Sequence, residues 1–417
     1  MTTRPSPGRL RTGRLRTGML ALLLTGALTG CSLLGGGDGG TGDPDGAKGS
    51  GGRSFTVAAA GDVLIHPELT AQAQADAKAA GKKGMDFGAI MAGIKPVISR
   101  ADLAICHMEP VLGKPEGPFR SFPDFIAPPQ ITATLKDIGY DTCSTASNHA
   151  LDHGEGGVRS TLDALDRAGL KHTGSARSAE EGGKPLIMDV KGVKVAQISF
   201  AGGFNGREVP ADKPWLVNKT SLDSISAAEK AARKAGAEVV ILSIHWGKEH
   251  QPAPNSLQIS LAKKIAGKTG VNLVIGHHAH VVQPMEKVGD TWVAYGLGNQ
   301  LARHEVPSGL SEEGVIGWFE FTEKDGKWDV RPRYVPTFVE LPPDPEQTAN
   351  GPKLPEAGQV KDHRLIDLAA ALNGTGAYQD VSDQRRARFR LAYDRTQGTL
   401  LNRGAGADGL EPLVRLD

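Results

Sequence analysis

From residue 54 onward, the sequence alternates short runs of apolar and β-branched residues with segments of helical periodicity. This alternation is typical of layered α/β proteins, in which helices cover the faces of sheets. The candidate strands are "SFTVAAAGD", "ADLAICHME", "YDTCSTAS", "VKVAQISFAG", "AEVVILSIHWG", "VNLVIGHHAH", "TWVAYGLGN", "GVIGWFEFTE" and "WDVRPRYVPTFVEL". The candidate helices span residues 69–80, 86–99, 129–138, 156–168, 221–235 and 256–268. The pattern predicts an α/β domain over residues 54–342.

The strand pattern stops after about residue 342, where a proline-rich link begins. Two segments with helix-like composition follow this link, at residues 361–373 and 380–398. We therefore predict that residues 343–417 form a linker and a C-terminal helical appendage that packs on the main domain.

Polar side chains follow several of the candidate strands at the point where each strand ends. They are Asp62, His66, Glu109, Asn148, His149, Asp152, His245, Glu249, His277, His278 and His280. In open α/β sheets the carboxyl ends of the strands line the ligand crevice, so these groups can converge. Taken singly, each has an ordinary alternative, such as a turn residue, a cap or a satisfied core histidine. Taken together, they indicate a site.

The stretch "LVIGHHAHVVQP" places three histidines within four positions. If the segment is extended, His278 and His280 point to one face, while His277 and Ala279 point to the other. The pair on one face could share a metal ion; a solvated polar loop is the alternative. Mixed carboxylate, amide and imidazole ligands favour Mn²⁺, Fe²⁺ or Zn²⁺ over Mg²⁺ or Ca²⁺. Two such ions, bridged by one carboxylate, would fit the number of candidate ligands.

The blocks "GDVLIHPE", "CHMEPVL", "SNHALDHGEGGVRSTLDALDRAGLKHTGSA", "HWGKEH", "GHHAHVVQPME" and "YGLGN" occur in this order. Together they resemble the signature of the CapA-type capsule (poly-gamma-glutamate) biosynthesis family. The resemblance implies the fold of the metallophosphatase-like (calcineurin-like) superfamily. That fold is a four-layer α/β/β/α sandwich of the metallo-dependent phosphatase type, in which helices flank two mixed sheets.

The resemblance also implies roles for individual residues. Asp62 would bind one ion, Asn148 would bind a second ion, and Glu109 would bridge the two. The remaining ligands would be His245, His278 and His280. His149 would act as a general acid or orient a phosphate, and Glu249 is a further candidate for handling a proton. Additional candidates are His66, Asp152 and His277, of which His277 is expected to support the site without binding an ion.

The sequence departs from the family pattern at five positions. The family usually has Pro where Ala279 stands, Asn where Ser147 stands and Tyr where His250 stands. It usually has Ser at the position of Gly296 and an aromatic residue at the position of Gln300. We expect these changes to preserve the metal site and to alter contacts with the substrate.

Residues 1–30 have the features of a secretory signal peptide: an arginine-rich start and the short apolar run "MLALLLTGAL". This run is too short for a permanent membrane-spanning helix. The approach to Cys31 resembles a bacterial lipobox, which implies an exported protein with a lipid anchor at Cys31, on the outer face of the cytoplasmic membrane. Simple secretion is the alternative. The glycine-rich residues 31–53 would then be a flexible tether.

Charge and cysteine content bound the function further. Removal of the five leader arginines changes the formal net charge from +1 to −4, which gives no electrostatic case for binding nucleic acid. Cys106 and Cys143 lie in strand-like runs. A disulfide would suit an exported protein, but neighbouring strands rarely offer the right geometry, so two buried free thiols are the favoured interpretation.

Two classes of function fit these residues. The first is a metal-dependent hydrolase or phosphoryl-transfer enzyme acting on phosphoesters, either in capsule synthesis or unrelated to it. The second is an envelope factor that binds an anionic polymer during its synthesis, retention or export, with capsule-synthesis membrane proteins as partners. A purely structural lipoprotein would leave the strand-end pattern unexplained. Neither a Walker-type nucleotide loop nor a nucleophile elbow stands out in the sequence.

Overall fold

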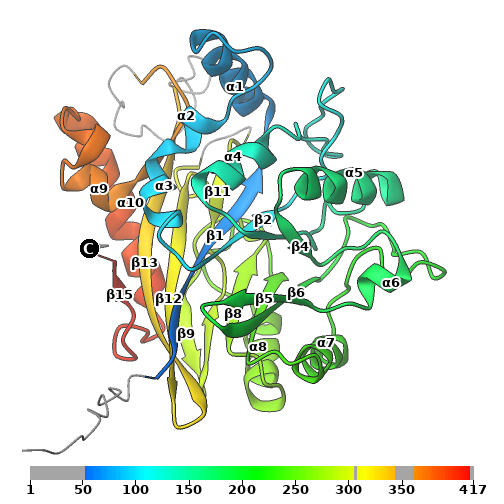
Figure 1. The fold of residues 1–417 in the computed structure, drawn as a ribbon. Helices are drawn as coiled ribbons and strands as arrows, with labels where there is room; N and C mark the ends of the chain where they lie inside the picture. The colour runs from blue at the N-terminus through cyan, green and yellow to red at the C-terminus, as the bar shows by residue number, and fades with distance from the viewer. Residues whose placement is uncertain (1–51, 305–307, 343–359, 414–417) are drawn as a thin grey trace, which may run out of the picture. The chain divides into compact units, whose positions relative to one another are not determined.

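The computed structural model describes residues 52–304, 308–342 and 360–413. The predicted signal peptide, Cys31 and nearly all of the predicted tether lie outside the described residues, as does most of the linker. Figure 1 shows the arrangement of the helices and strands.

The first sheet has nine strands and runs in the order β14-β13-β12-β1-β2-β3-β4, with β11 beside β1 and β15 beside β13. Its strands are β1 (Ser54–Leu64), β2 (Leu103–Met108), β3 (Thr142–Ser144), β4 (Lys171–Thr173), β11 (Asn299–Ala302), β12 (Glu313–Lys324), β13 (Lys327–Glu340), β14 (Arg364–Asp367) and β15 (Glu411–Pro412). The pairs from β1 to β4 are parallel, whereas β12, β13 and β14 add antiparallel pairs. The sheet is therefore mixed.

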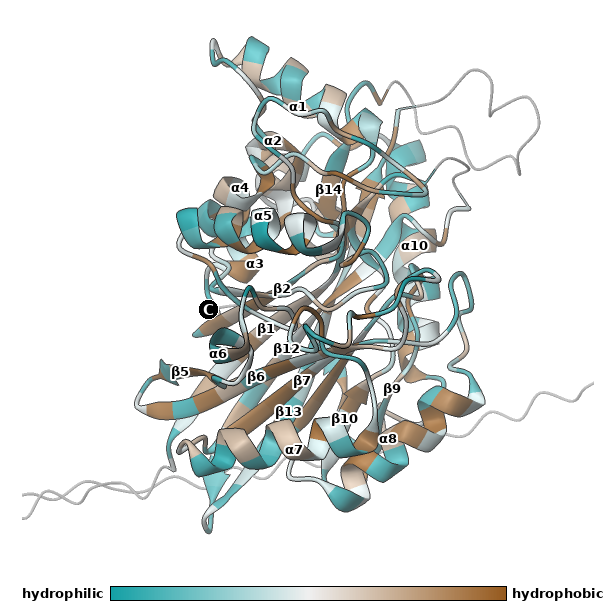
Figure 2. Cartoon of the chain, turned by 90° about the vertical axis from the view of Figure 1, so that its right-hand side faces the viewer, coloured by the Kyte–Doolittle hydropathy of each residue, from teal (hydrophilic) through white to brown (hydrophobic). Residues whose placement is uncertain are grey.

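The second sheet has six strands in the order β5-β6-β7-β8-β10-β9. They are β5 (Leu186–Val190), β6 (Val193–Ala201), β7 (Val239–His245), β8 (Leu273–His277), β9 (Met285–Val288) and β10 (Thr291–Ala294). The four strands β6, β7, β8 and β10 are parallel, and antiparallel strands close both edges. Figure 2 shows that the strands of this region are largely hydrophobic.

Three hydrophobic cores separate four layers. One core lies between the two sheets and includes Val57, Ile105, Ile241 and Phe319. A second covers the other face of the first sheet with α1 (Pro67–Ala79), α2 (Gly88–Met91), η1 (Ala92–Ile94), α3 (Lys95–Ile98), α4 (Ile131–Ile138) and α5 (Gly154–Arg167). The third packs α7 (Leu222–Lys234) and α8 (Ser256–Lys268) on the second sheet. The predicted four-layer α/β/β/α sandwich is confirmed.

The C-terminal part contains both helices and strands. The helices are α9 (Leu368–Leu372), η2 (Gly376–Tyr378) and α10 (Asp383–Leu401), and they enclose a small core with β13 and β14. The prediction that residues 361–373 are helical was wrong for β14, which pairs with β13 over Thr337–Glu340. The prediction that strands end near residue 342 was wrong for the same reason. A four-residue strand is too short to show a period, and its hydrogen bonds to β13 decide its conformation.

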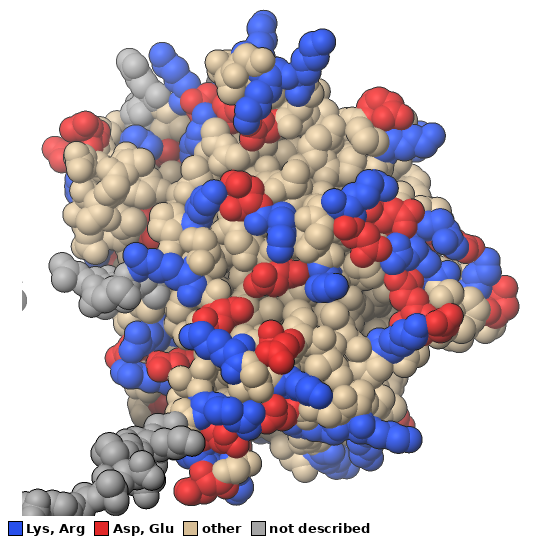
Figure 3. Space-filling view, in the orientation of Figure 1, with Lys and Arg blue, Asp and Glu red and all other residues tan. Residues whose placement is uncertain are grey.

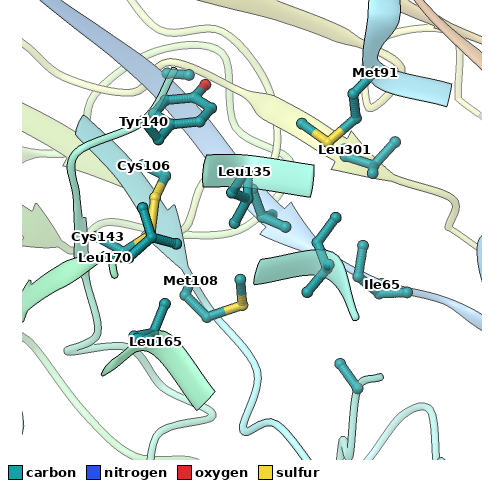
Figure 4. Close-up of a cluster of buried hydrophobic side chains, with 14 of the residues drawn as sticks. Ile65, Met91, Cys106, Met108, Leu135, Tyr140, Cys143, Leu165, Leu170 and Leu301 are labelled. Atoms are coloured by element: carbon teal, nitrogen blue, oxygen red, sulfur yellow. A yellow bond between two sulfur atoms is a disulfide. The ribbon is translucent and has the colours of Figure 1, made fainter. Parts of the chain in front are cut away.

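Cys106 and Cys143 form a disulfide, so the favoured interpretation of two free thiols was wrong. The two residues are register partners on the parallel strands β2 and β3, and their Cα atoms are 4.4 Å apart. Figure 4 shows the bond within the core beneath the helices, close to Leu165, Leu170 and Tyr140. Sequence alone does not reveal register, and it is register that brings the two sulfur atoms together.

Among the described residues, no helix has both the length and the apolar character needed to cross a membrane.

Candidate metal centre

The carboxyl ends of strands from both sheets meet at one place. Asp62 lies near the end of β1, Glu109 follows β2, and Asn148 lies just beyond β3. From the second sheet, His245 ends β7, and His278 and His280 follow β8. All six predicted ligands are thus brought to the same crevice, as expected for strand ends in layered sheets.

Two glycines allow the chain segments around this crevice to approach one another closely. A Cβ atom at Gly61 would lie 2.1 Å from the carbonyl oxygen of Gly298, and one at Gly276 would lie 2.0 Å from that of Tyr295. Any side chain would force these segments apart. Because Gly61 precedes Asp62 and Gly276 precedes His277, the glycines fix the depth at which these residues sit.

Asp62 is fully buried and is surrounded by the histidine tract. One carboxylate oxygen lies 2.9 Å from Nδ1 of His277, and the other accepts a hydrogen bond from the backbone N–H of His278. Burial opposes ionisation, but the hydrogen bond from His277 and the nearby His107 and His280 rings together lower the pKa of Asp62. Asp62 is therefore held as a carboxylate, the form that binds a cation.

The geometry of the histidine tract differs from the predicted extended segment. Strand β8 ends at His277, and His278 and His280 have φ angles of 89° and 55°, in the left-handed region. Alternation along a strand therefore does not explain why their side chains share one side. Two left-handed residues turn the backbone around Asp62 instead, and non-glycine residues adopt this region mainly where the surrounding structure requires it.

Glu109 is the most informative residue of the site. Its side chain is buried, and neither carboxylate oxygen has a hydrogen-bond partner. Oε1 lies 3.5 Å from Nε2 of His280 and 3.9 Å from Nε2 of His245. Burial, followed by the negative charge of Asp62, raises the pKa of Glu109 well above its usual range. A buried carboxylate without a partner is costly, and a bound cation would remove that cost.

His245 and His278 favour the neutral form, which is the form that binds metal. Burial, together with the neighbouring His278 ring, lowers the pKa of His245 well below the usual value. Burial and the nearby His280 lower the pKa of His278 to about 4. Nδ1 of His280 lies 2.9 Å from Oδ1 of Asn299, an oxygen that can only accept, so Nε2 of His280 keeps its lone pair.

These donors are close enough to share ions. Ligand atoms of Asp62, Glu109 and His280 lie within 4.8 Å of one another. Asp62 also groups with His107 and His245 within the same range, and Nε2 of His245 lies 2.9 Å from Oδ1 of Asn148. The oxygen and nitrogen donors, with the two oxygens of Glu109 that lack a hydrogen-bond partner, fit divalent cations.

His149 belongs to a hydrogen-bonded chain beside the ligands. Its Nδ1 lies 2.6 Å from Oδ2 of Asp152, and Asp152 also pairs with Arg207. The amide of Asn205 accepts from Asn148 and approaches His149. Asp152, predicted as an additional ligand, lies outside the three possible metal-binding groups of the described residues and instead orients His149.

The remaining predicted residues have different environments. His277 bonds to Asp62 through Nδ1, while its buried Nε2 has no hydrogen-bond partner. His66 lies outside the three possible metal-binding groups of the described residues, and burial lowers its pKa to about 4. Glu249 has a half-exposed side chain, with Oε1 3.9 Å from Nδ1 of His278. One carboxylate oxygen of Glu249 and ring nitrogens of His278 and His280 lie within 4.8 Å of one another, close enough to share an ion.

A cavity of about 950 Å³ opens above the ligands. Its wall includes Asn148, His149, Arg207, Glu249 and His280. At its mouth stands Phe122, whose side chain is 80% exposed. The volume is in the range of small-molecule sites, so a substrate group can reach His149 and the ligand cluster together.

Sequence reasoning missed several residues of the site. Asn299 orients His280, and His304 packs its ring 5.0 Å from that of His280. His107 is buried in β2, and ligand atoms of His107, Asp62 and His245 all lie within 4.8 Å of one another. A histidine among the apolar residues of "AICHMEP" was the available signal, but it stands within the strand and not after it.

Comparisons with known proteins place the chain among capsule proteins. The family model described as "Bacterial capsule synthesis protein PGA_cap" matches residues 56–304. The chain is 30% identical over 169 residues to "Capsule biosynthesis protein CapA" of Bacillus anthracis, which covers 40% of this chain and 41% of that protein. It is 31% identical over 175 residues to "PGA biosynthesis protein CapA" of Bacillus subtilis, covering 40% and 43%. The matches thus span less than half of these two relatives.

Among solved structures, the chain resembles a phosphatase from Mycoplasma pneumoniae with a TM-score of 0.41 and 14% identity. The match covers 72% of this chain and 98% of the phosphatase.

Proposed function

Because this chain belongs to the bacterial capsule synthesis protein PGA_cap family, we propose that it is a metal-dependent hydrolase of the cell envelope. It acts on a phosphoester during the synthesis, export or processing of an anionic capsule polymer. One observation carries the proposal: both oxygens of Glu109 are buried without a hydrogen-bond partner, and Oε1 lies 3.5 Å from Nε2 of His280 and 3.9 Å from Nε2 of His245. A cation bound there would stabilise the ionised form of this buried carboxyl group.

The proposed cofactor is a pair of divalent transition ions, Mn, Fe or Zn. Asp62, Glu109 and His280 would hold one ion. The ligands of the second would be Glu109, Asn148, His245 and His278. Ions bound there would polarise a substrate oxygen and lower the pKa of a bound water.

His149 is the proposed proton donor to the leaving oxygen. Asp152 engages its Nδ1 at 2.6 Å, which leaves Nε2 for the substrate in the cavity. Arg207 pairs with Asp152 and Asp124, so the orientation of the dyad is held from outside as well. A buried, oriented histidine of this kind suits general acid catalysis. Glu249, at the cavity wall, is the second candidate for proton transfer.

The charge distribution favours binding of one anionic group at a time. Figure 3 shows acidic and basic side chains interspersed over the face that it draws. The cavity wall is also mixed: it includes Arg207 and Arg303 together with Glu68, Asp124 and Glu249. A long polyanion binds best to a continuous basic groove. We therefore place the main attraction for a phosphate or polymer carboxylate at the ions, and we propose no nucleic-acid partner.

We further propose that the protein is exported and lipid-anchored at Cys31, beside capsule-synthesis membrane proteins. The arginine-rich leader and the short apolar run support this location. Replacement of Cys31 by Ser should move the protein from the membrane fraction to the medium or leave it unprocessed. Normal cleavage with unchanged membrane retention would contradict the anchor.

The central experiment compares metal content and phosphodiesterase activity in three variants. His245→Ala and His280→Ala should each lose bound metal and hydrolysis of bis-p-nitrophenyl phosphate. His172→Ala is the control, because His172 lies on β4 and pairs with Asp166, outside the cluster. Metal contents equal to wild type in both site variants would refute the two-ion site. Full metal binding in the wild type without hydrolysis of any phosphoester would leave the site and refute the activity.

A further inference from the structure

A chain of hydrogen bonds runs beneath the metal ligands from Ser144 to Asn148. Oγ of Ser144 lies 2.8 Å from Nδ1 of His107. Nε2 of His107 lies 3.0 Å from Nδ1 of His245, and Nε2 of His245 lies 2.9 Å from Oδ1 of Asn148. The four residues of this chain are all buried.

The direction of donation along this chain is restricted. A neutral imidazole ring carries one proton, and Nε2 of His107 faces Nδ1 of His245 at 3.0 Å. Only one proton fits between the two rings. The tautomers are therefore coupled: the rings carry their protons either both on Nε2 or both on Nδ1.

In each of the two tautomeric arrangements, the last donor of the chain has a hydrogen-bond acceptor. When the protons are on Nε2, His245 donates to Asn148, whose amide is oriented by its bond to Asn205. His107 then donates to His245 and accepts from the Ser144 hydroxyl. When the protons are on Nδ1, His245 donates to His107 and His107 donates to Ser144. The hydroxyl can then turn to the carbonyl oxygen of Cys106, 3.3 Å away.

We propose that His107 is a positioning residue for His245, and that cation binding reverses the direction of donation along this chain. The inference rests on the proposed function, because it takes His245 as a metal ligand. Without a cation, Nε2 of His245 donates to Asn148. A cation needs the lone pair of this nitrogen, so the proton must be on Nδ1, where Nε2 of His107 accepts it.

The reversal conserves the protons of the chain. One proton leaves Nε2 of His245 for solvent, and Nδ1 of His245 takes the proton from Nε2 of His107. Nδ1 of His107 takes the proton from Ser144, and the Ser144 oxygen regains one proton from solvent. The chain therefore neither gains nor loses charge, and the two buried rings remain neutral in both states.

The direct test is the tautomeric state of the two histidines, read from nitrogen-15 chemical shifts of the imidazole rings. Metal-free protein should show both rings protonated at Nε2. Addition of Zn²⁺ should convert both rings to the Nδ1 form together. Nδ1 protonation before Zn²⁺ is added, or conversion of His245 without His107, would overturn the inference. A wild-type protein that binds no Zn²⁺ would overturn both the reversal and the two-ion site, whereas the other two results leave the site intact.

Two substitutions of His107 test its contact with Ser144 and its contact with His245 separately. His107→Asn keeps a donor near Ser144 but is too short to reach His245, whereas His107→Gln places an amide near His245 that can accept or donate. We expect the Zn²⁺ affinity to fall about 10- to 100-fold in His107→Asn and to stay within about 3-fold of wild type in His107→Gln. Equal losses in two folded variants would show that His107 only fills space. Thermal unfolding of both metal-free variants controls for loss of structure.

Discussion

Two buried glutamates in this molecule have opposite surroundings. Glu313, at the start of β12, pairs with Arg388 and Arg395 of α10, and Arg388 also lies over the ring of Phe338. Glu109 is buried to a similar extent, but neither of its oxygens has a hydrogen-bond partner, and its nearest basic groups are the rings of His245 and His280. Burial raises the pKa of both carboxyl groups, but only Glu313 has arginines that oppose the increase. The chain thus supplies its own cations where a carboxylate holds the fold together, and supplies no arginine or lysine at the carboxylate that we propose binds an external cation.

The largest loss of stability is expected when Glu313 loses one of its arginine partners. Arg388→Ala should lower the free energy of unfolding by about 3–5 kcal/mol, because it leaves Glu313 buried with one fewer partner. Urea unfolding measures the loss. Arg390→Ala on the same helix is the matched control: Arg390 is exposed and lies 3.9 Å from Asp394, so the loss there should stay below about 1 kcal/mol. Similar losses of unfolding free energy in Arg388→Ala and Arg390→Ala would show that the buried ion pair contributes no more than the exposed one.

A smaller change in stability is expected at the other glutamate. Glu109→Gln should abolish binding of at least one metal ion, yet change the stability of metal-free protein by less than about 1 kcal/mol at pH 5, because no partner is lost. Metal analysis and urea unfolding give the two values. Glu313→Gln should do the reverse, keeping the metal and losing several kcal/mol. Strong destabilisation of metal-free protein by Glu109→Gln would show that Glu109 has a structural partner.

The two glutamates can also be distinguished by pH. The raised pKa of Glu109 means that its contribution to the stability of metal-free protein is complete below about pH 4.5 and is lost as pH rises through the raised pKa. Metal-free Glu109→Gln should therefore gain stability relative to wild type between pH 5 and pH 8. Saturating Zn²⁺ should remove the cost of ionising Glu109 in the wild type. A stability difference that is constant over this range would refute the raised pKa.

The smallest effect is expected at the cavity mouth. Because the Phe122 side chain is 80% exposed, Phe122→Ala should change the free energy of unfolding by less than about 0.5 kcal/mol and leave the metal content unchanged. A metal content below that of the wild type would show that Phe122 helps to position the metal ligands, and that metal binding depends on more than the buried ligands themselves.

Much of this site could be predicted from the sequence, because its ligands stand where apolar runs end. Asp62, Glu109, Asn148 and His245 each follow a local pattern that needs no knowledge of the partner strand. His107 could not be found this way, since its role depends on register: it is the partner of Asp62 in the pairing of β1 with β2. The same limit applies to the disulfide, to β14 and to the left-handed turn at His278 and His280.

The α/β class was predictable for a related reason. Alternating strands and helices specify layers, and most hydrophobic runs were long enough to show their period, whereas the four-layer sandwich was implied by the family resemblance. The short strands β4, β5, β9, β11 and β15 were missed, because each has only two to five residues and is defined by its neighbours.

The disulfide between Cys106 and Cys143 also determines how the molecule responds to a protease. It closes a covalent loop with a sequence separation of 37, and this loop carries Glu109, Phe122 and helix α4. The exposed Arg120 lies within it and precedes Ser121, so it offers trypsin a site in the connection before α4, whereas the exposed Lys114 precedes Pro115, a bond that trypsin does not cut. A cut at Arg120 leaves the two fragments covalently joined, so the cleaved protein runs as two pieces on a gel only after reduction. One wall of the cavity can therefore be nicked without being released.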